Sequence, residues 1–282
     1  GPTISGWLIE KLSWNWLFFI NIPIGITAIL FIIWMIPDYR IGIAKSLDKP
    51  GLILVVLSST SLLVGLSQGH SWGWTSGRTL GLFAFGTVAL ILFIRWELKT
   101  PDSLLDLRVF KNSRFSITLV ANTIITISLY SGTLLVPLFL QSVQKVSPLD
   151  TGLIMLPASL IMALAMPVAG KLYPRFGAKW LTLIGIVLII VGSYKMTELV
   201  STESYLYIII WMAVRNLGVS FAAAATSTAG MEEIQPHMIG HASSVSNWVR
   251  NVGGSFAIAL FSSLLSSHFV SHMADFAKDG GT

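Results

Sequence analysis

Two arginines, Arg215 and Arg250, lie inside stretches that are otherwise apolar enough to sit in a lipid bilayer. Each follows about nine or ten residues of its stretch, and at about 1.5 Å per helical residue both depths fall near the bilayer midplane. A cation at that depth costs at least about 2.5 kcal/mol, so it usually faces a water-filled path, a counter-charge or a substrate. Both arginines are therefore candidates for a site that binds or moves charge.

A polar stripe runs along the predicted helix at 115–140. Its members are spaced three or four residues apart, which places them on one helix face: Asn122, Thr126, Tyr130, Thr133 and Pro137. Such a stripe suits either the wall of a water-filled cavity or hydrogen bonding to a neighbouring helix. The sequence leaves both interpretations open.

The stretch 242–268 repeats this pattern around the second arginine. Its shared face carries Ser243, Asn247, Arg250, Gly254 and Ala257. We interpret this face, with the adjoining Asn251, as cavity wall rather than as ordinary packing. Gly253 and Gly254 are small enough to let a neighbouring helix approach closely.

Composition identifies the protein class and the elements that position these residues. The 282 residues are 54% hydrophobic and only 11% charged, which excludes a soluble domain. Eight apolar stretches are each long enough to cross a hydrocarbon core of about 30 Å as a helix: 17–36, 52–68, 79–96, 115–140, 151–170, 180–196, 205–230 and 242–268. We predict an all-α polytopic membrane protein with eight complete transmembrane helices, and residues 1–12 as the end of a ninth.

Enzyme chemistry finds no support in the motifs. Cysteine is absent, which excludes disulfides, thiolate metal ligands and a cysteine nucleophile. The sequence has no nucleotide-binding glycine loop, zinc-binding helix or cofactor fingerprint. His268 and His272 are four residues apart but have no third ligand nearby. We expect no enzyme, no cofactor and no metal.

Loop charges predict the orientation, because cytoplasmic loops carry the excess of Lys and Arg. Eleven of the eighteen basic residues fall in one alternating set of loops, five in the other set, and two are Arg215 and Arg250. The richer set, at 37–51, 97–114, 171–179 and 231–241, is therefore predicted to be inside. Because these basic residues gather at the membrane surface, we expect no nucleic-acid partner.

Several spaced strings along the chain form a set, beginning with Gly1-Pro2-x-x-x-Gly6 and residues 14–25, WNWLFFINIPIG. The first resembles the end of the antiporter motif of the fourteen-helix drug:proton antiporters of the major facilitator superfamily, and the second resembles the signature that follows that motif. Residues 137–141 and 147–157 resemble the helix–loop–helix leading into the C-terminal domain, with Pro137 in the first string. Lys145 stands where the family more often has Gly. Residues 170–179, with Gly170, Arg175 and Gly177, resemble the second copy of the cytoplasmic gating loop, although Pro174 replaces its usual Asp.

The resemblance implies an arrangement for the chain. Residues 1–36 would be the last two helices of the N-terminal bundle, and 37–97 would hold two additional helices. Residues 98–114 would be a cytoplasmic connector, either a solvated linker or an amphipathic segment along the membrane. Residues 115–282 would form a C-terminal bundle lacking its last helix, so the chain would be a fragment.

The resemblance also implies proton-coupled efflux of drugs or other amphipathic molecules across the bacterial cytoplasmic membrane by alternating access. Its partners would be a small-molecule substrate, protons and the bilayer, and it would act as a monomer; accessory proteins cannot be inferred. A narrow exporter of one antibiotic or metabolite is an alternative, as is a scaffold or sensor that has kept the fold without transporting.

Proton coupling needs a titrating group, usually a buried carboxylate. No Asp or Glu lies in the middle of a predicted span, because Glu10, Glu97, Glu198 and Glu232 fall at helix ends. We therefore predict that the proton carrier lies on helices outside this chain. Arg215 and Arg250 would hold that carboxylate or bind an anionic part of a substrate. The predicted substrate and proton pathway is Arg215, Arg250, Asn122, Thr126, Tyr130, Asn247 and Asn251.

Overall fold

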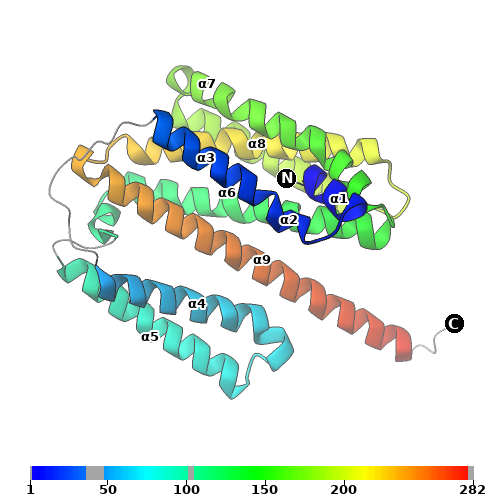
Figure 1. Cartoon of the computed structure of the whole chain (residues 1–282), viewed down its shortest axis with the longest axis horizontal. Helices are drawn as coiled ribbons and strands as arrows, with labels where there is room; N and C mark the ends of the chain where they lie inside the picture. Colours follow the sequence, from blue (N-terminus) through cyan, green and yellow to red (C-terminus); the bar gives the residue numbers. More distant parts are fainter. Residues whose placement is uncertain (1, 36–47, 101–104, 279–282) are drawn as a thin grey trace. The chain divides into compact units, whose positions relative to one another are not determined.

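The computed structural model describes residues 2–35, 48–100 and 105–278, and the side chains of 4–35, 48–100 and 105–265 within them. All regular structure in these ranges is helical, as the sequence predicts (Figure 1). The helices form two compact units: one combines Gly1–Lys45 with Val136–Phe221, and the other combines Ser46–Leu135 with Ala222–Thr282. Two long helices, α6 (Ser113–Leu138) and α8 (Tyr205–Met231), contribute to both units.

The first unit is built on the long helix α7. Its elements are α1 (Pro2–Lys11), α2 (Trp16–Phe19), α3 (Asn21–Met35), η2 (Phe139–Val143), α7 (Pro148–Thr197) and the first part of α8. Helix α1 packs on α7 at Gly6, where an added Cβ would overlap the backbone of Pro148. The core of this unit joins Leu140, Met155 and Ile208, from η2, α7 and α8.

Helix α7 is two helices joined at one residue. Fifty residues at about 1.5 Å each far exceed the ~30 Å thickness of a hydrocarbon core. Gly177 breaks the helix with φ 70° and ψ 170°, a backbone conformation that glycine adopts without steric cost. The predicted loop at 171–179 is therefore wrong in extent, because the chain remains helical through Phe176 and turns at Gly177.

The end of α6 is irregular. Pro137 lies within its last turn, and the chain continues as a π-helix, η2, through Val143. Proline lacks the N–H for the regular helical bond, so a change of helix type beside it is expected. Lys145 then adopts φ 57°, in the left-handed region that favours glycine. A glycine at this position would adopt the same conformation without steric cost.

The second unit contains the helix pair α4 (Lys49–Trp72) and α5 (Gly77–Lys99), which run side by side (Figure 1). The 3-10 turns η1 (Leu107–Lys111) and η3 (Pro236–Met238) and the helix α9 (Ile239–Lys278) complete it with most of α6 and the end of α8. Helix α4 contacts both α5 and α9. The α4–α5 pair, which the sequence predicts to be the two additional helices, is thus packed through α4 against the helix that carries Arg250.

The connector is folded onto the second unit. Leu105 and Val109 are buried in its core cluster, so these side chains face protein rather than the membrane surface or solvent. Glu97 is completely buried, and its carboxylate accepts a hydrogen bond of 3.0 Å from the Leu105 N–H. Glu97 does lie at a helix end, but its burial was not predicted from the sequence.

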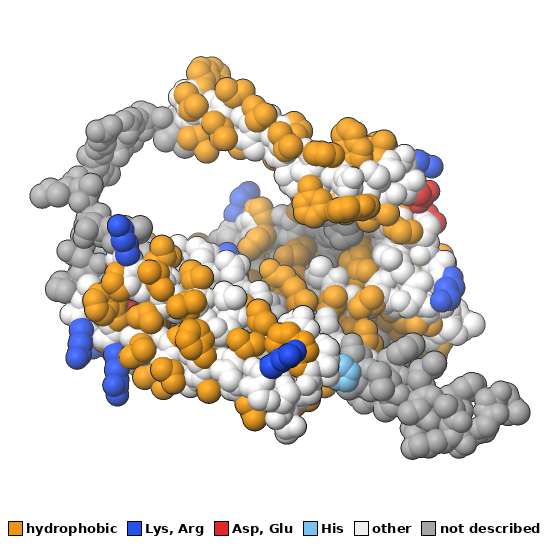
Figure 2. Space-filling model, turned by 60° about the horizontal axis from the view of Figure 1, so that its bottom comes forward, with side chains coloured by type: hydrophobic (Ala, Val, Ile, Leu, Met, Phe, Trp, Pro, Cys, Tyr) orange, Lys and Arg blue, Asp and Glu red, His pale blue; other side chains and the backbone are white. Residues whose placement is uncertain are grey.

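Large apolar side chains remain exposed along most of the helices, and in Figure 2 they cover long stretches of surface with few charged side chains among them. In the described residues, six helices are long and apolar enough to cross a membrane: Trp16–Met35, Lys49–Trp72, Gly77–Lys99, Ser113–Val143, Pro148–Thr197 and Tyr205–Met231. One of these is the broken α7, and α9 is not among them. The predicted number of eight complete spans therefore stays a prediction.

Candidate functional site

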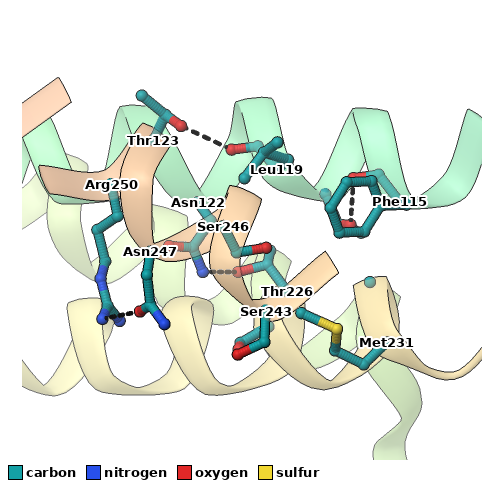
Figure 3. A pocket seen from close by; sticks show the side chains of 13 residues that line it. Phe115, Leu119, Asn122, Thr123, Thr226, Met231, Ser243, Ser246, Asn247 and Arg250 are labelled. Carbon is teal, nitrogen blue, oxygen red and sulfur yellow. Dashed lines mark hydrogen bonds between the residues drawn. The ribbon is translucent and has the colours of Figure 1, made fainter. Parts of the chain in front are cut away.

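A polar recess lies in the second unit between α6, α8 and α9 (Figure 3). Thirteen residues line it: Phe115, Thr118, Leu119, Asn122 and Thr123 of α6, Thr226, Ser227, Gly230 and Met231 of α8, and Ser243, Ser246, Asn247 and Arg250 of α9. Its volume is about 90 Å³. That is room for several waters, but drug-sized pockets span roughly 300–1,000 Å³. By itself the recess accommodates a polar group, not a whole drug.

Arg250 and Asn247 form the charged end of the recess. The Arg250 guanidinium donates a 2.7 Å hydrogen bond to Asn247 Oδ1, and the two side chains lie side by side in Figure 3. Both are exposed. Among the described residues that line the recess none is acidic, and the guanidinium is the only formal charge among them.

The opposite end of the recess is apolar. Phe115 and Met231 lie there, away from Arg250 (Figure 3). Between the ends, the Asn122 amide donates to Thr226 Oγ1 at 3.1 Å and joins α6 to α8. The recess thus changes from a cation through neutral hydroxyl and amide groups to apolar side chains.

The predicted pathway residues divide by location. Asn122, Asn247 and Arg250 line the recess together. Thr126 is buried and donates to the Asn122 carbonyl within its own helix. Asn251 is exposed and outside the lining.

Tyr130 belongs to the contact between α6 and α9. An added Cβ on Gly254 would lie 2.5 Å from Tyr130 Cε2, and one on Gly253 would lie 2.9 Å from Thr123 Cγ2. Such separations are shorter than side chains tolerate, so the glycine pair permits the close approach that the sequence predicts. Of the residues in this contact, Thr123 also lines the recess, whereas Tyr130, Gly253 and Gly254 lie outside the lining.

Arg215 lies in the first unit and does not line the recess. It is 3% exposed, between α8 and the second half of α7, where its Nε donates to Ser193 Oγ at 3.3 Å. An added Cβ on Gly192 would lie 2.8 Å from Arg215 Cβ. The neighbouring Asn216 is also buried and donates to the Ala158 carbonyl at 3.2 Å.

The residues of the predicted gating loop at 170–179 are mostly exposed. Gly170 and Arg175 are exposed, and Gly177 forms the break in α7. Gly6 makes the close contact described above, whereas Gly1 and the side chain of Pro2 lie outside the described part of the structure. The side chains of His268 and His272 lie outside it as well. Within the described residues, no three His, Asp or Glu side chains are grouped as metal ligands.

Sequence reasoning missed part of the lining. Thr226 and Ser227 follow four consecutive alanines in α8, where no polar stripe of regular spacing marks them. Thr123 and Ser246 directly adjoin stripe residues in the sequence but were not predicted as part of the site. A search for hydroxyl residues within otherwise small, apolar segments would have found the pair in α8.

The sequence model of the Major Facilitator Superfamily matches residues 1–258. The chain belongs to this superfamily. The predicted membership is confirmed. Superfamily proteins of this kind are transporters rather than enzymes, and with its bacterial relatives and apolar helices the chain is a multi-pass bacterial membrane protein.

Relatives of this superfamily member include proteins named for multidrug transport and for antibiotic resistance. It is 32% identical over its whole length to the uncharacterized MFS-type transporter YhcA of Bacillus subtilis, of which it covers 53%. It is 29% identical to the multidrug transporter protein MdtP of Bacillus subtilis, with 95% of this chain and 50% of that protein covered. It is 28% identical to the lincomycin resistance protein LmrB of Listeria monocytogenes, with 95% and 57% covered. The chain therefore spans about half the length of these curated relatives.

Proposed function

We propose that the protein exports drugs or other amphipathic small molecules in exchange for protons by alternating access, and that the recess binds the polar part of the substrate. The superfamily and the relatives named for multidrug transport and antibiotic resistance support efflux. The observation that carries the site is the exposed Arg250 in a recess whose described lining includes no acidic residue.

The graded lining of the recess suits an amphipathic substrate. A hydrogen-bond acceptor or anionic group would lie at Arg250 and Asn247, and an apolar group would continue past Phe115 and Met231. Because the recess holds about 90 Å³, the rest of the substrate extends beyond it. The recess would therefore form one wall of the transport cavity.

The proposal gives Arg250 one of two roles in transport. It pairs with a proton-carrying carboxylate on another part of the complete protein, or it binds an anionic part of the substrate directly. A cation at this depth usually faces a water-filled path, a counter-charge or a substrate, and the two roles correspond to the last two of these. In the first role, Arg250 changes the pH dependence of transport; in the second, it changes the preference among substrates.

Efflux of a lipophilic dye that carries an anionic or hydrogen-bond-accepting group, from energised cells that express the complete protein, tests the proposal. We expect efflux that stops with a protonophore, and an Arg250→Ala variant that inserts normally but exports at least about tenfold less. Hydrogen bonds to a charged group contribute roughly 1.5–3 kcal/mol, which corresponds to about ten- to hundredfold. Arg78→Ala removes an exposed arginine outside the recess and serves as the control. Normal efflux from Arg250→Ala would refute the assignment of this site.

A narrow exporter of one antibiotic is the second candidate, because one relative is named for resistance to lincomycin alone. Absence of dye efflux from well-inserted protein, together with resistance to a single drug in a panel, would favour it over multidrug export.

A further inference from the structure

Helix α9 presents two different faces over the same two turns. Ser243, Asn247 and Arg250 line the recess, whereas Val245 and Trp248 belong to the core cluster of the second unit or pack against it. Successive helical residues are turned by about 100°, so Trp248 points roughly opposite to Arg250. Whatever holds Trp248 therefore sets the direction of the arginine.

Trp248 is held by both helices of the additional pair. Its indole N–H donates to Ser59 Oγ of α4 at 3.3 Å. Its ring lies 6.0 Å, between centroids, from the ring of Phe93 of α5, at an interplanar angle of 54°. Phe93 is completely buried, so this contact has little freedom to shift.

The packing continues from the additional pair to the recess. The core cluster joins Val55 of α4, Phe93 of α5, Val245 of α9 and two residues of α6, Phe115 and Leu119. The last two also line the recess. Close-packed side chains transmit displacement because they leave few voids to absorb it. A shift of α4 and α5 therefore reaches the recess lining.

We propose that the α4–α5 pair positions the recess, with Trp248 as the positioning residue that fixes the rotation of α9 and directs Asn247 and Arg250 into it. Arg250 is exposed and bonded to a residue of its own helix, so its location depends on the backbone that carries it. The additional helices thus contribute to substrate binding without touching substrate. This inference rests on the proposed function for its transport readout only.

Cysteine labelling reads the rotation of α9 directly. This chain has no cysteine, so a single reporter can be placed at Asn247 in the recess or at Asn251 outside it, with any cysteines elsewhere in the complete protein replaced by serine. The measured quantity is the ratio of labelling rates, 247 to 251, with a water-soluble thiosulfonate reagent. We expect Trp248→Leu to change this ratio at least about threefold, because the large side chain that sets the rotation is lost.

Transport kinetics of the same variants, without reporters, provide the second readout. Trp248→Leu is expected to raise KM at least about fivefold with a smaller change in kcat, since the site is displaced rather than removed. Trp248→Phe keeps the ring contact but removes the N–H that donates to Ser59. Ser59→Ala removes the acceptor of the same hydrogen bond. These two variants should each have a small effect, and the double variant no more than either one, because they break the same bond.

Trp180→Leu is the matched control, because Trp180 is 58% exposed on α7 in the other unit. An unchanged labelling ratio and KM in folded Trp248→Leu, or changes equal to those of the control, would overturn the proposal. If Trp248→Leu does not fold, additive effects of Trp248→Phe and Ser59→Ala on KM would overturn it instead. If the wild type exports nothing, the proposed function fails, but the labelling ratio still tests the positioning.

Discussion

The surroundings of Arg215 and Arg250 differ although both arginines interrupt apolar helices. Arg215 is 3% exposed between α7 and α8, at a point where Gly192 allows the helices to meet closely. Arg250 is exposed in a recess lined by hydroxyl and amide groups. A buried arginine contributes packing through its long stem as well as charge. An exposed arginine remains accessible to a ligand or counter-charge. The position of an arginine along an apolar helix therefore does not by itself show whether it packs the structure or binds a ligand.

Alanine variants of the two arginines should show the largest difference between the two regions. Arg215→Ala is expected to destabilise the protein by roughly 2–4 kcal/mol, because a large buried side chain is removed from a helix contact. Arg250→Ala should leave stability nearly unchanged while efflux falls at least about tenfold. Thermal unfolding in detergent and efflux in cells measure the two effects. A stable Arg215→Ala that has lost transport would instead place Arg215 in the pathway, as the sequence predicts.

A close helix contact at a glycine occurs in each region, and the loss of stability caused by Gly→Ala should be reversible by a second mutation in only one of them. An added Cβ at Gly218 would lie 2.5 Å from the Gly185 carbonyl oxygen, whereas one at Gly254 would meet the ring of Tyr130. We expect Gly218→Ala and Gly254→Ala each to cost about 1–3 kcal/mol. Only the second should be rescued, by Tyr130→Leu, because a ring can be shortened and a backbone cannot. Thermal unfolding of the double variant tests this, and rescue of neither would show that both contacts are equally rigid.

Alanine variants of two asparagines, one in each region, should show a smaller difference in stability and KM. Asn216 donates to Ala158 in the buried contact, and Asn122 donates to Thr226 in the recess wall. Hydrogen bonds between membrane helices average about 0.6 kcal/mol, so either alanine variant should lower stability only slightly. Asn122→Ala should additionally raise KM, whereas Asn216→Ala should leave it unchanged. A raised KM in Asn216→Ala would connect the buried contact to substrate binding.

The smallest effect concerns the loop that follows α7 in the first unit. A hydrogen bond from Lys195 lowers the pKa of Glu198 from its ordinary value of 4.5. A carboxylate whose pKa is lower in the folded protein than in the unfolded chain stabilises the fold at pH values above the ordinary pKa. This stabilisation is lost as the pH falls through the folded-state pKa. Lowering the pH below about 5 should therefore reduce the melting temperature of the wild type slightly more than that of Glu198→Gln, which lacks the carboxylate. The pair is exposed, so identical curves would show that it contributes nothing measurable.

The sequence predicted the helical class, the superfamily and the approximate helix ranges, because hydrocarbon selects long apolar segments and every such segment must form its own backbone hydrogen bonds. The helical spacing of polar residues in the sequence also singled out Asn122, Asn247 and Arg250, which the structure brings together in one recess. It did not predict the recess residues in α8, the burial of Glu97 or the packing of the connector.

What covers each helix face was decided only by the tertiary structure. A sequence specifies which side of its own helix a residue occupies, but not whether that side meets a helix, water or lipid. Arg215 meets Gly192 and Ser193 because small residues there let α7 approach α8, whereas Arg250 remains exposed beside the hydroxyl groups of α6 and α8. The difference between the two arginines arises from these neighbours, which are far away in the sequence and come together only in the folded chain.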